Sequence, residues 1–194
     1  MEKISPELKA AIVALSADEK DKLLLRLKPD LIKKLTYELL EEKETLDART
    51  TKVQNTIDEY LQSVGGWFTP GNLMMAMRSC NGLITEHVKV TKDKMGEVFL
   101  TLHLLLKAFE LWRTKLNEFD RNRSMTFSEY VVKRTTMLID KAQKLDPIFQ
   151  DDITEQINRI LDYLYAYEHS KRLAENEKLP EFYVFGDVVK KKKK

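Results

Sequence analysis

Apolar residues recur along this chain at spacings of three and four, which is the pattern of amphipathic helices. The prolines stand at the boundaries of the apolar stretches. Pro6, Pro29, Pro70 and Pro147 each open one, as suits a residue whose missing N–H is tolerated in the first helical turn. Pro180 closes the last stretch. The pattern predicts an all-α fold of about seven antiparallel helices.

The first third of the chain predicts two short helices and then one or two longer ones. Ser16 and Glu19 fit a capping box, which would start the second short helix. Helical spacing then continues from Pro29 to Val64. One long helix with a polar middle and two helices broken near residues 45–51 both fit this stretch. Gly65-Gly66 ends it in either case.

The stretch from about Lys92 to Phe119 carries apolar residues on nearly every face. Leu102 and Leu105 lie on its main apolar stripe. Further apolar cover on the far side comes from Leu100, Leu104 and Leu111. A helix that is apolar nearly all round is buried on several sides. We therefore expect this helix to occupy the centre of the fold.

The segment after this helix resembles the calcium loop of EF-hands. Asp120, Asn122 and Ser124 match its first, third and fifth positions, and Glu129 could stand for its final ligand. The segment is shorter than the family's loop and lacks the glycine of the sharp turn. We expect a polar interhelical loop that does not bind calcium. Thr126 and Glu129 fit a capping box, which predicts the start of the next helix there.

Two further helices are predicted before the tail. The first runs to about Lys144, with Met137 on its inner face. Asp146-Pro147 caps the second, whose apolar stripe runs from Phe149 to Tyr167. Residues 1–178 would then form one helical domain.

Residues 179–194 are expected to form an extended, partly disordered basic tail. The apolar run from Phe182 to Phe185 could dock on the helical body. The tail ends in five candidate anion contacts: Lys190, Lys191, Lys192, Lys193 and Lys194. Removing these five from the 33 basic residues leaves 28 against 31 acidic ones, a net charge of −3. An acidic body speaks against a nucleic-acid-binding domain, although the lysines would attract nucleic acid weakly.

The chain carries no strong catalytic, metal or nucleotide motif. Its histidines, His87, His103 and His169, are isolated in the sequence. Leu106 and Lys107 occupy the positions where a helix would place a second metal ligand beside His103. We therefore predict no metal site, no cofactor and no catalytic residue, and we expect His103 to be a core or interface histidine.

Cys80 is the single cysteine, so the chain cannot form an internal disulfide and suits a reducing compartment. We expect a half-buried structural thiol rather than a nucleophile. The first residues are polar and show no signal peptide. The longest apolar run, from Val98 to Leu106, is far shorter than the roughly 18 residues that span a bilayer. These features predict a cytoplasmic protein without a transmembrane segment.

Three aromatic residues are candidates for contact with a partner. Trp67 and Phe68 stand in a connector, where they could plug the ends of helices or form the lip of a binding groove. Tyr165 should point outward from the last helix, because Tyr167 belongs to the core stripe and Tyr163 flanks it. Exposed aromatic residues are enriched at protein interfaces.

The opening of the chain, Leu15-Ser16-Ala17-Asp18-Glu19-Lys20-Asp21-Lys22-Leu23, is similar to the start of uncharacterised all-helical bacterial proteins. The resemblance implies antiparallel helices in a bundle or an irregular HEAT-like stack, and no activity.

The strong helical pattern without site chemistry favours a protein-interaction or scaffold module whose partner is a protein. An accessory protein that associates with nucleic acid through its lysine tail is the second hypothesis. It requires salt-dependent binding that disappears without the tail. An enzyme of unrecognised type is the third, and it requires a deep pocket that holds charged groups.

Overall fold

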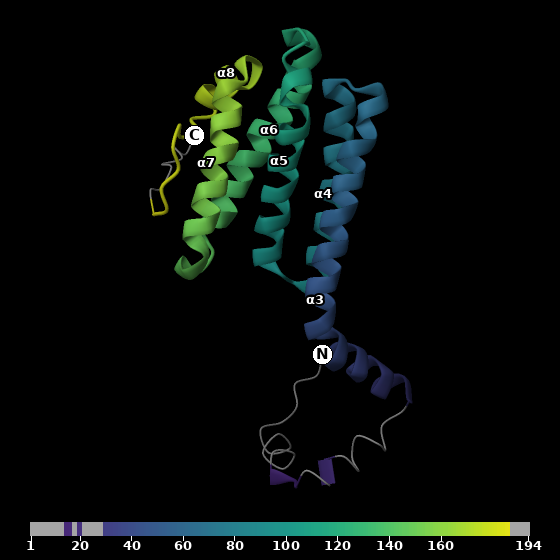
Figure 1. Cartoon of the computed structure of the whole chain (residues 1–194). Coiled ribbons are helices and arrows are strands. Elements are labelled where there is room, and N and C mark those ends of the chain that lie inside the picture. Colours follow the sequence, from purple (N-terminus) through teal and green to yellow (C-terminus); the bar gives the residue numbers. More distant parts are fainter. Residues whose placement is uncertain (1–13, 17–18, 21–28, 187–194) are drawn as a thin grey trace. The chain divides into compact units, whose positions relative to one another are not determined.

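The computed structural model describes residues 14–16, 19–20 and 29–186, with the backbone alone for 29–45. The chain divides into two compact units, Met1–Ala48 and Arg49–Lys194. The described residues form helices, turns and irregular segments and include no strand (Figure 1). The predicted all-α fold is confirmed.

The capping box near the start of the first unit is confirmed. The backbone N–H of Ser16 donates to Glu19 at 2.9 Å, and the backbone N–H of Glu19 donates to the hydroxyl of Ser16 at 3.4 Å. These reciprocal bonds satisfy two amide groups that a helix start leaves without partners. The rest of the two predicted short helices lies almost wholly outside the described residues.

Helix α3 (Pro29–Ser63) is continuous, so the one-helix alternative for this stretch is correct. It starts at the proline that predicted it, and the boundary between the two units falls within it. The 3₁₀ turn η1 (Val64–Trp67) follows and contains both glycines. A Cβ atom on Gly65 would lie 3.0 Å from the indole ring of Trp112, so a residue without a side chain fits this close approach.

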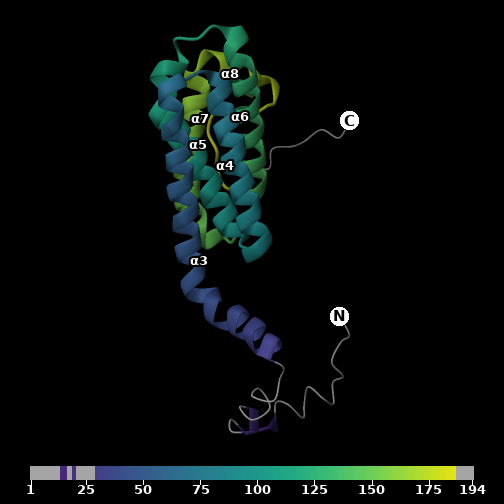
Figure 2. The ribbon, with the colours of Figure 1, turned by 90° about the vertical axis from the view of Figure 1, so that its right-hand side faces the viewer.

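The second unit stacks consecutive antiparallel helices side by side (Figures 1 and 2). Its further helices are α4 (Pro70–Thr91), α5 (Lys94–Leu116), α6 (Arg121–Ala142), α7 (Gln150–Ala166) and α8 (Glu168–Asn176). Helix α5 packs against α4, α6 and α7, and α6 packs against α4, α5, α7 and α8. The central place predicted for α5 is confirmed, and α6 shares it.

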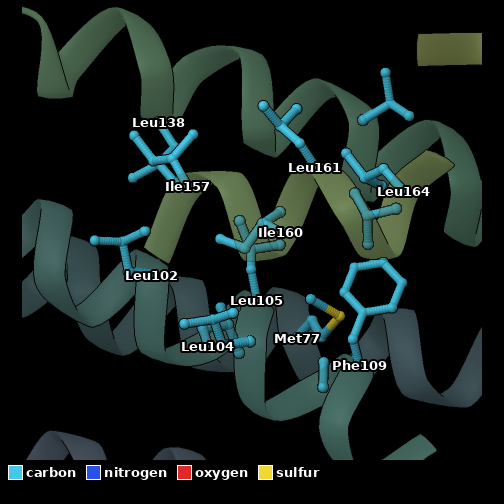
Figure 3. Close-up of a cluster of buried hydrophobic side chains, with 14 of the residues drawn as sticks. Met77, Leu102, Leu104, Leu105, Phe109, Leu138, Ile157, Ile160, Leu161 and Leu164 are labelled. Atoms are coloured by element: carbon cyan, nitrogen blue, oxygen red, sulfur yellow. The ribbon is translucent and has the colours of Figure 1, made fainter. Parts of the chain in front are cut away.

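The side chains of α5 supply much of the apolar core. Ten of its residues are buried, and Leu102 and Leu105 are fully buried as predicted. They meet apolar side chains of α6 and α7, including Leu138, Ile157 and Ile160 (Figure 3). On the far side of the helix Leu100 and Leu104 are also buried, whereas Leu111 keeps 38% of its surface exposed.

Helix α6 begins earlier than the sequence predicted. Asp120 is its N-cap, and its Oδ1 accepts the backbone N–H of Arg123 at 3.0 Å. The predicted loop from Asp120 to Glu129 and the helix start at Thr126 are therefore wrong, because these residues form the first turns of α6. Met137 is exposed, so its predicted place on the inner face is also wrong.

The predicted last helix is two helices. Asp146 caps a 3₁₀ turn, η2 (Pro147–Phe149), and α7 follows it. Tyr167 then adopts an extended conformation, with φ −89° and ψ 108°, and separates α7 from α8. Tyr167 is buried as expected, whereas Phe149 lies before α7 with its side chain exposed.

The start of the predicted tail docks on the helical body, as its apolar run indicated. The backbone N–H of Tyr183 donates to Oδ1 of Asn158 on α7 at 2.7 Å. The amide of Asn158 donates in return to the carbonyl oxygen of Tyr183 at 3.1 Å. The disorder predicted for the lysines falls on residues outside the described part of the chain. Within the described part, no helix is long and apolar enough to cross a membrane.

Candidate interaction surface

Aromatic side chains gather where η1, the second half of α5 and the α5–α6 turn meet. Phe68 stacks on Trp112 with ring centroids 4.9 Å apart, and Phe119 meets Phe68 edge-on at 5.8 Å. Offset stacking and edge contacts are the favoured geometries of aromatic pairs. Phe68 is half-buried in this cluster, which supports the interpretation of this side chain as a plug.

Trp112 fixes the cluster to α3. Its indole N–H donates to the carbonyl oxygen of Leu61 at 3.0 Å, which satisfies one of the carbonyl groups that the end of α3 leaves without a helical partner. The ammonium group of Lys115 lies 5.3 Å from the Trp112 ring centroid and 5.9 Å from that of Phe68. These distances allow cation–π attraction, so the aromatic cluster carries a positive charge at its edge.

Trp67 differs from its neighbour Phe68, because 63% of its surface is exposed. Its backbone is nevertheless fixed. The carbonyl oxygen of Trp67 accepts the side-chain amide of Asn72 at 2.9 Å, and the Thr69 hydroxyl caps α4 by accepting the N–H of Asn72 at 3.1 Å. A large indole ring is therefore held toward solvent on a constrained turn. We define the aromatic surface as Trp67, Phe68, Trp112, Lys115 and Phe119.

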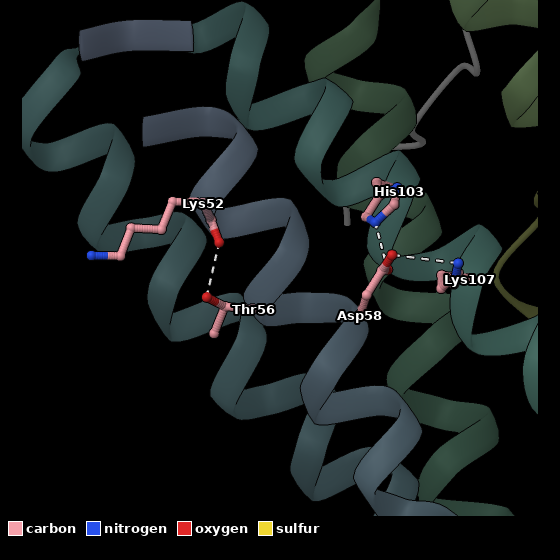
Figure 4. A network of polar contacts seen from close by, with 5 residues as sticks. All are labelled: Lys52, Thr56, Asp58, His103 and Lys107. Atoms are coloured by element: carbon pink, nitrogen blue, oxygen red, sulfur yellow. Dashed lines mark hydrogen bonds and ion pairs between the residues drawn. The ribbon is translucent and has the colours of Figure 1, made fainter. Parts of the chain in front are cut away.

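A polar network joins α3 to α5 (Figure 4). Nε2 of His103 lies 2.8 Å from one carboxylate oxygen of Asp58, and the ammonium of Lys107 lies 3.4 Å from the other. The expected interface role of His103 thus has a partner, which no local sequence pattern indicates because Asp58 lies far away along the chain. In the same figure, the hydroxyl of Thr56 donates a hydrogen bond to the carbonyl oxygen of Lys52 within α3.

Cys80 and the two other histidines occupy structural positions. Cys80 is fully buried rather than half-buried, and burial raises the pKa of its thiol to about 12. The thiolate is the nucleophilic form of cysteine, so this shift disfavours nucleophilic chemistry. Burial lowers the pKa of His87, and neither of its ring nitrogens has a hydrogen-bond partner. Nε2 of His169 lies 3.1 Å from the carbonyl oxygen of Phe119.

A pocket of about 390 Å³, which no sequence pattern predicted, opens between α6 and α8. Its lining consists of Arg121, Met125, Glu168, His169, Arg172, Leu173 and Asn176. The lining includes no serine, threonine or cysteine that could act as a nucleophile. Two arginines could hold a small anion, although the carboxylate of Glu168 on the same wall opposes this. Among the described residues, no group of three or more His, Cys, Asp or Glu side chains is arranged to hold a metal ion.

Tyr165 does not point freely into solvent, contrary to the prediction from helical spacing. It is partly buried, and its hydroxyl donates to the carbonyl oxygen of Leu179 at 2.7 Å. Burial raises the pKa of this phenol, and the carboxylates of Glu181 and Glu175 add to the rise. A partner contact at Tyr165 stays a prediction, as do anion contacts at Lys190–Lys194, which lie outside the described residues.

Comparison of this chain with protein-family models, with curated proteins and with solved structures finds no match.

Proposed function

We propose that this chain is a protein-interaction or scaffold module that binds a protein partner through the aromatic surface. The observation that carries the proposal is the exposure of Trp67 on a backbone held by Asn72 and Thr69. Tryptophan is among the residues most enriched at interface positions that dominate binding energy. A fixed turn also reduces the entropy that binding costs.

The surroundings of Trp67 indicate the chemistry of the partner. Phe68, the next residue in the sequence, stacks on Trp112, and Lys115 places an ammonium group over both of their rings. A partner segment that presents an apolar side chain next to a carboxylate would match these groups. The apolar contact would supply affinity, and the charge would favour one orientation.

Site-specific photocrosslinking tests the proposal. The photoreactive residue p-benzoylphenylalanine would replace Trp67 in one variant and Met75 in a control. Met75 is a matched position on α4, because it is also apolar and 56% exposed. We expect a protein to crosslink from position 67 and not from position 75. Mass spectrometry would then identify this protein for purification.

Binding of the purified partner is the decisive measurement. Trp67→Ala should weaken it at least about thirtyfold, because a dominant interface residue contributes roughly 2 kcal/mol or more. Met75→Ala should leave the Kd within about twofold, and neither exposed substitution should change Tm by more than a degree or so. Equal binding by wild type and Trp67→Ala would overturn the proposal.

A further inference from the structure

The start of the C-terminal segment presents an apolar edge on a fixed backbone. Tyr183 is buried and held by its two hydrogen bonds to Asn158, so the segment lies along α7 (Figure 1). Phe182, 67% exposed, precedes Tyr183, and Val184 follows it, also exposed. One residue is therefore buried between two exposed ones in this segment. Phe185 extends the exposed apolar edge.

A run of positive charge follows this edge in the sequence. Lys190 is five residues beyond Phe185, and four more lysines follow it. Five residues span at most about 18 Å even when fully extended, so the charges and the apolar edge can reach the same surface. The rest of the chain has a net charge of −3, because 28 basic residues face 31 acidic ones. An anionic surface would therefore attract this end of the chain and repel the remainder.

We propose that the chain attaches peripherally to an anionic lipid surface through Phe182, Val184 and Phe185 together with Lys190–Lys194. Apolar side chains at the headgroup boundary and a polybasic segment are complementary signals, and stable attachment generally needs two of them. A nucleic acid would use the lysines but has no need of the exposed phenylalanines. The proposal goes beyond the proposed function, because it rests on a different part of the molecule from the aromatic surface.

Vesicle co-sedimentation of the full chain tests this attachment. We expect sedimentation with vesicles of phosphatidylcholine mixed with phosphatidylserine, and none with phosphatidylcholine alone. Replacing Lys190–Lys194 with glutamine should lower the partition coefficient at least about a hundredfold, since each lysine near such a surface contributes roughly fivefold. Phe182→Ser with Phe185→Ser should lower it at least about tenfold through lost apolar contact. Ile148→Ser is the matched control, because Ile148 is an exposed apolar residue outside this segment, and it should change nothing.

A fluorescence measurement separates insertion from a merely structural role. Tryptophan in place of Phe182 should shift its emission to shorter wavelength when phosphatidylserine vesicles are added, since the indole would leave water. Retained binding by the double serine variant, with equal competition by duplex RNA, would overturn the proposal and identify the lysines as a general anion contact. Equal sedimentation with uncharged vesicles would also overturn it. Trp67→Ala should leave vesicle binding unchanged, so this test stands apart from that of the proposed function.

Discussion

Replacement of Leu105 with alanine tests the central place of α5 in the fold. Leu105 has no exposed surface and lies at the middle of the cluster that α5 forms with α6 and α7 (Figure 3). Ile160 and Leu104 lie beside it in this cluster. Protein interiors are closely packed, so the neighbours can collapse only partly into the space that a smaller side chain leaves.

The loss of stability expected for Leu105→Ala follows from the apolar surface that this side chain buries. Leu105→Ala removes the equivalent of about three methylene groups, which is roughly 2.4 kcal/mol of transfer free energy. The cavity that remains adds to this loss, and buried leucine-to-alanine changes cost roughly 2–5 kcal/mol in total. Leu111→Ala on the same helix is the matched control. Leu111 is 38% exposed, so its replacement returns less apolar surface to water and should cost at most about 1.5 kcal/mol.

Urea unfolding followed by far-UV circular dichroism measures both losses. Leu105→Ala should lower the midpoint without changing the slope, because the surface exposed on unfolding is nearly the same. Its Tm should fall by roughly 4–20 °C, at about 2–4 °C per kcal/mol for a chain of this size. A loss under about 0.5 kcal/mol, or an equal loss in Leu111→Ala, would refute the inference that α5 is central.

Four further expectations follow from the described residues and the sequence. Far-UV circular dichroism should show about two-thirds helix or more, and strand content above roughly 15% would contradict the fold. Burial lowers the pKa of His87, so the unfolded chain binds a proton at this residue more readily than the folded chain does. The contribution of His87 to the free energy of unfolding should therefore be greatest above about pH 6.5 and decrease as the pH falls below this value. In urea titrations, His87→Leu should make the free energy of unfolding depend less on pH in this range. Calorimetry should detect no micromolar calcium site between Asp120 and Glu129, because a helical backbone cannot wrap oxygen ligands around the ion. A micromolar calcium site that disappears in Glu129→Gln would refute this expectation. The full chain should bind nucleic acid weakly, and the slope of log K against log salt should be no steeper than about −5. Deleting Lys190–Lys194 should abolish this binding and leave Tm unchanged. Binding by the truncated chain near physiological salt would indicate a basic groove elsewhere.

Local sequence patterns predicted the features that local energetics decide. Pro29 and Pro70 mark the starts of α3 and α4, because a proline at the first helical position loses no hydrogen bond. The burial of Leu102 and Leu105 followed from helical periodicity, since these positions face the same side of α5. Both inferences needed only neighbours within a few turns.

The start of α6 was mispredicted because two capping patterns competed. Asp120 and Thr126 can each cap a helix, and nothing local decides between them. The choice depends on tertiary burial, since Ser124 and Phe127 are buried in the first turns of α6. The break between α7 and α8 was missed for a related reason. Tyr167 is buried on extended backbone, so the apolar periodicity continues through the break.

The contacts of the candidate sites join residues that are distant in the sequence. Asp58 meets His103, the indole of Trp112 meets the carbonyl group of Leu61, and Asn158 meets the backbone of Tyr183. Such pairs leave no periodic signal. The sequence identified the connector that holds Trp67 and Phe68, but only the stacking of Phe68 on Trp112 shows which of the two adjacent rings remains in solvent.

Because the thiol of Cys80 is buried, the rate at which it reacts reports how often the fold opens around it. It is the single cysteine, and burial both shields it and raises its pKa to about 12, so a thiol reagent at neutral pH finds almost no reactive target in the closed fold. Each labelling event then requires a local opening that exposes Cys80. The labelling rate therefore measures local opening around Cys80 under native conditions, without an engineered cysteine.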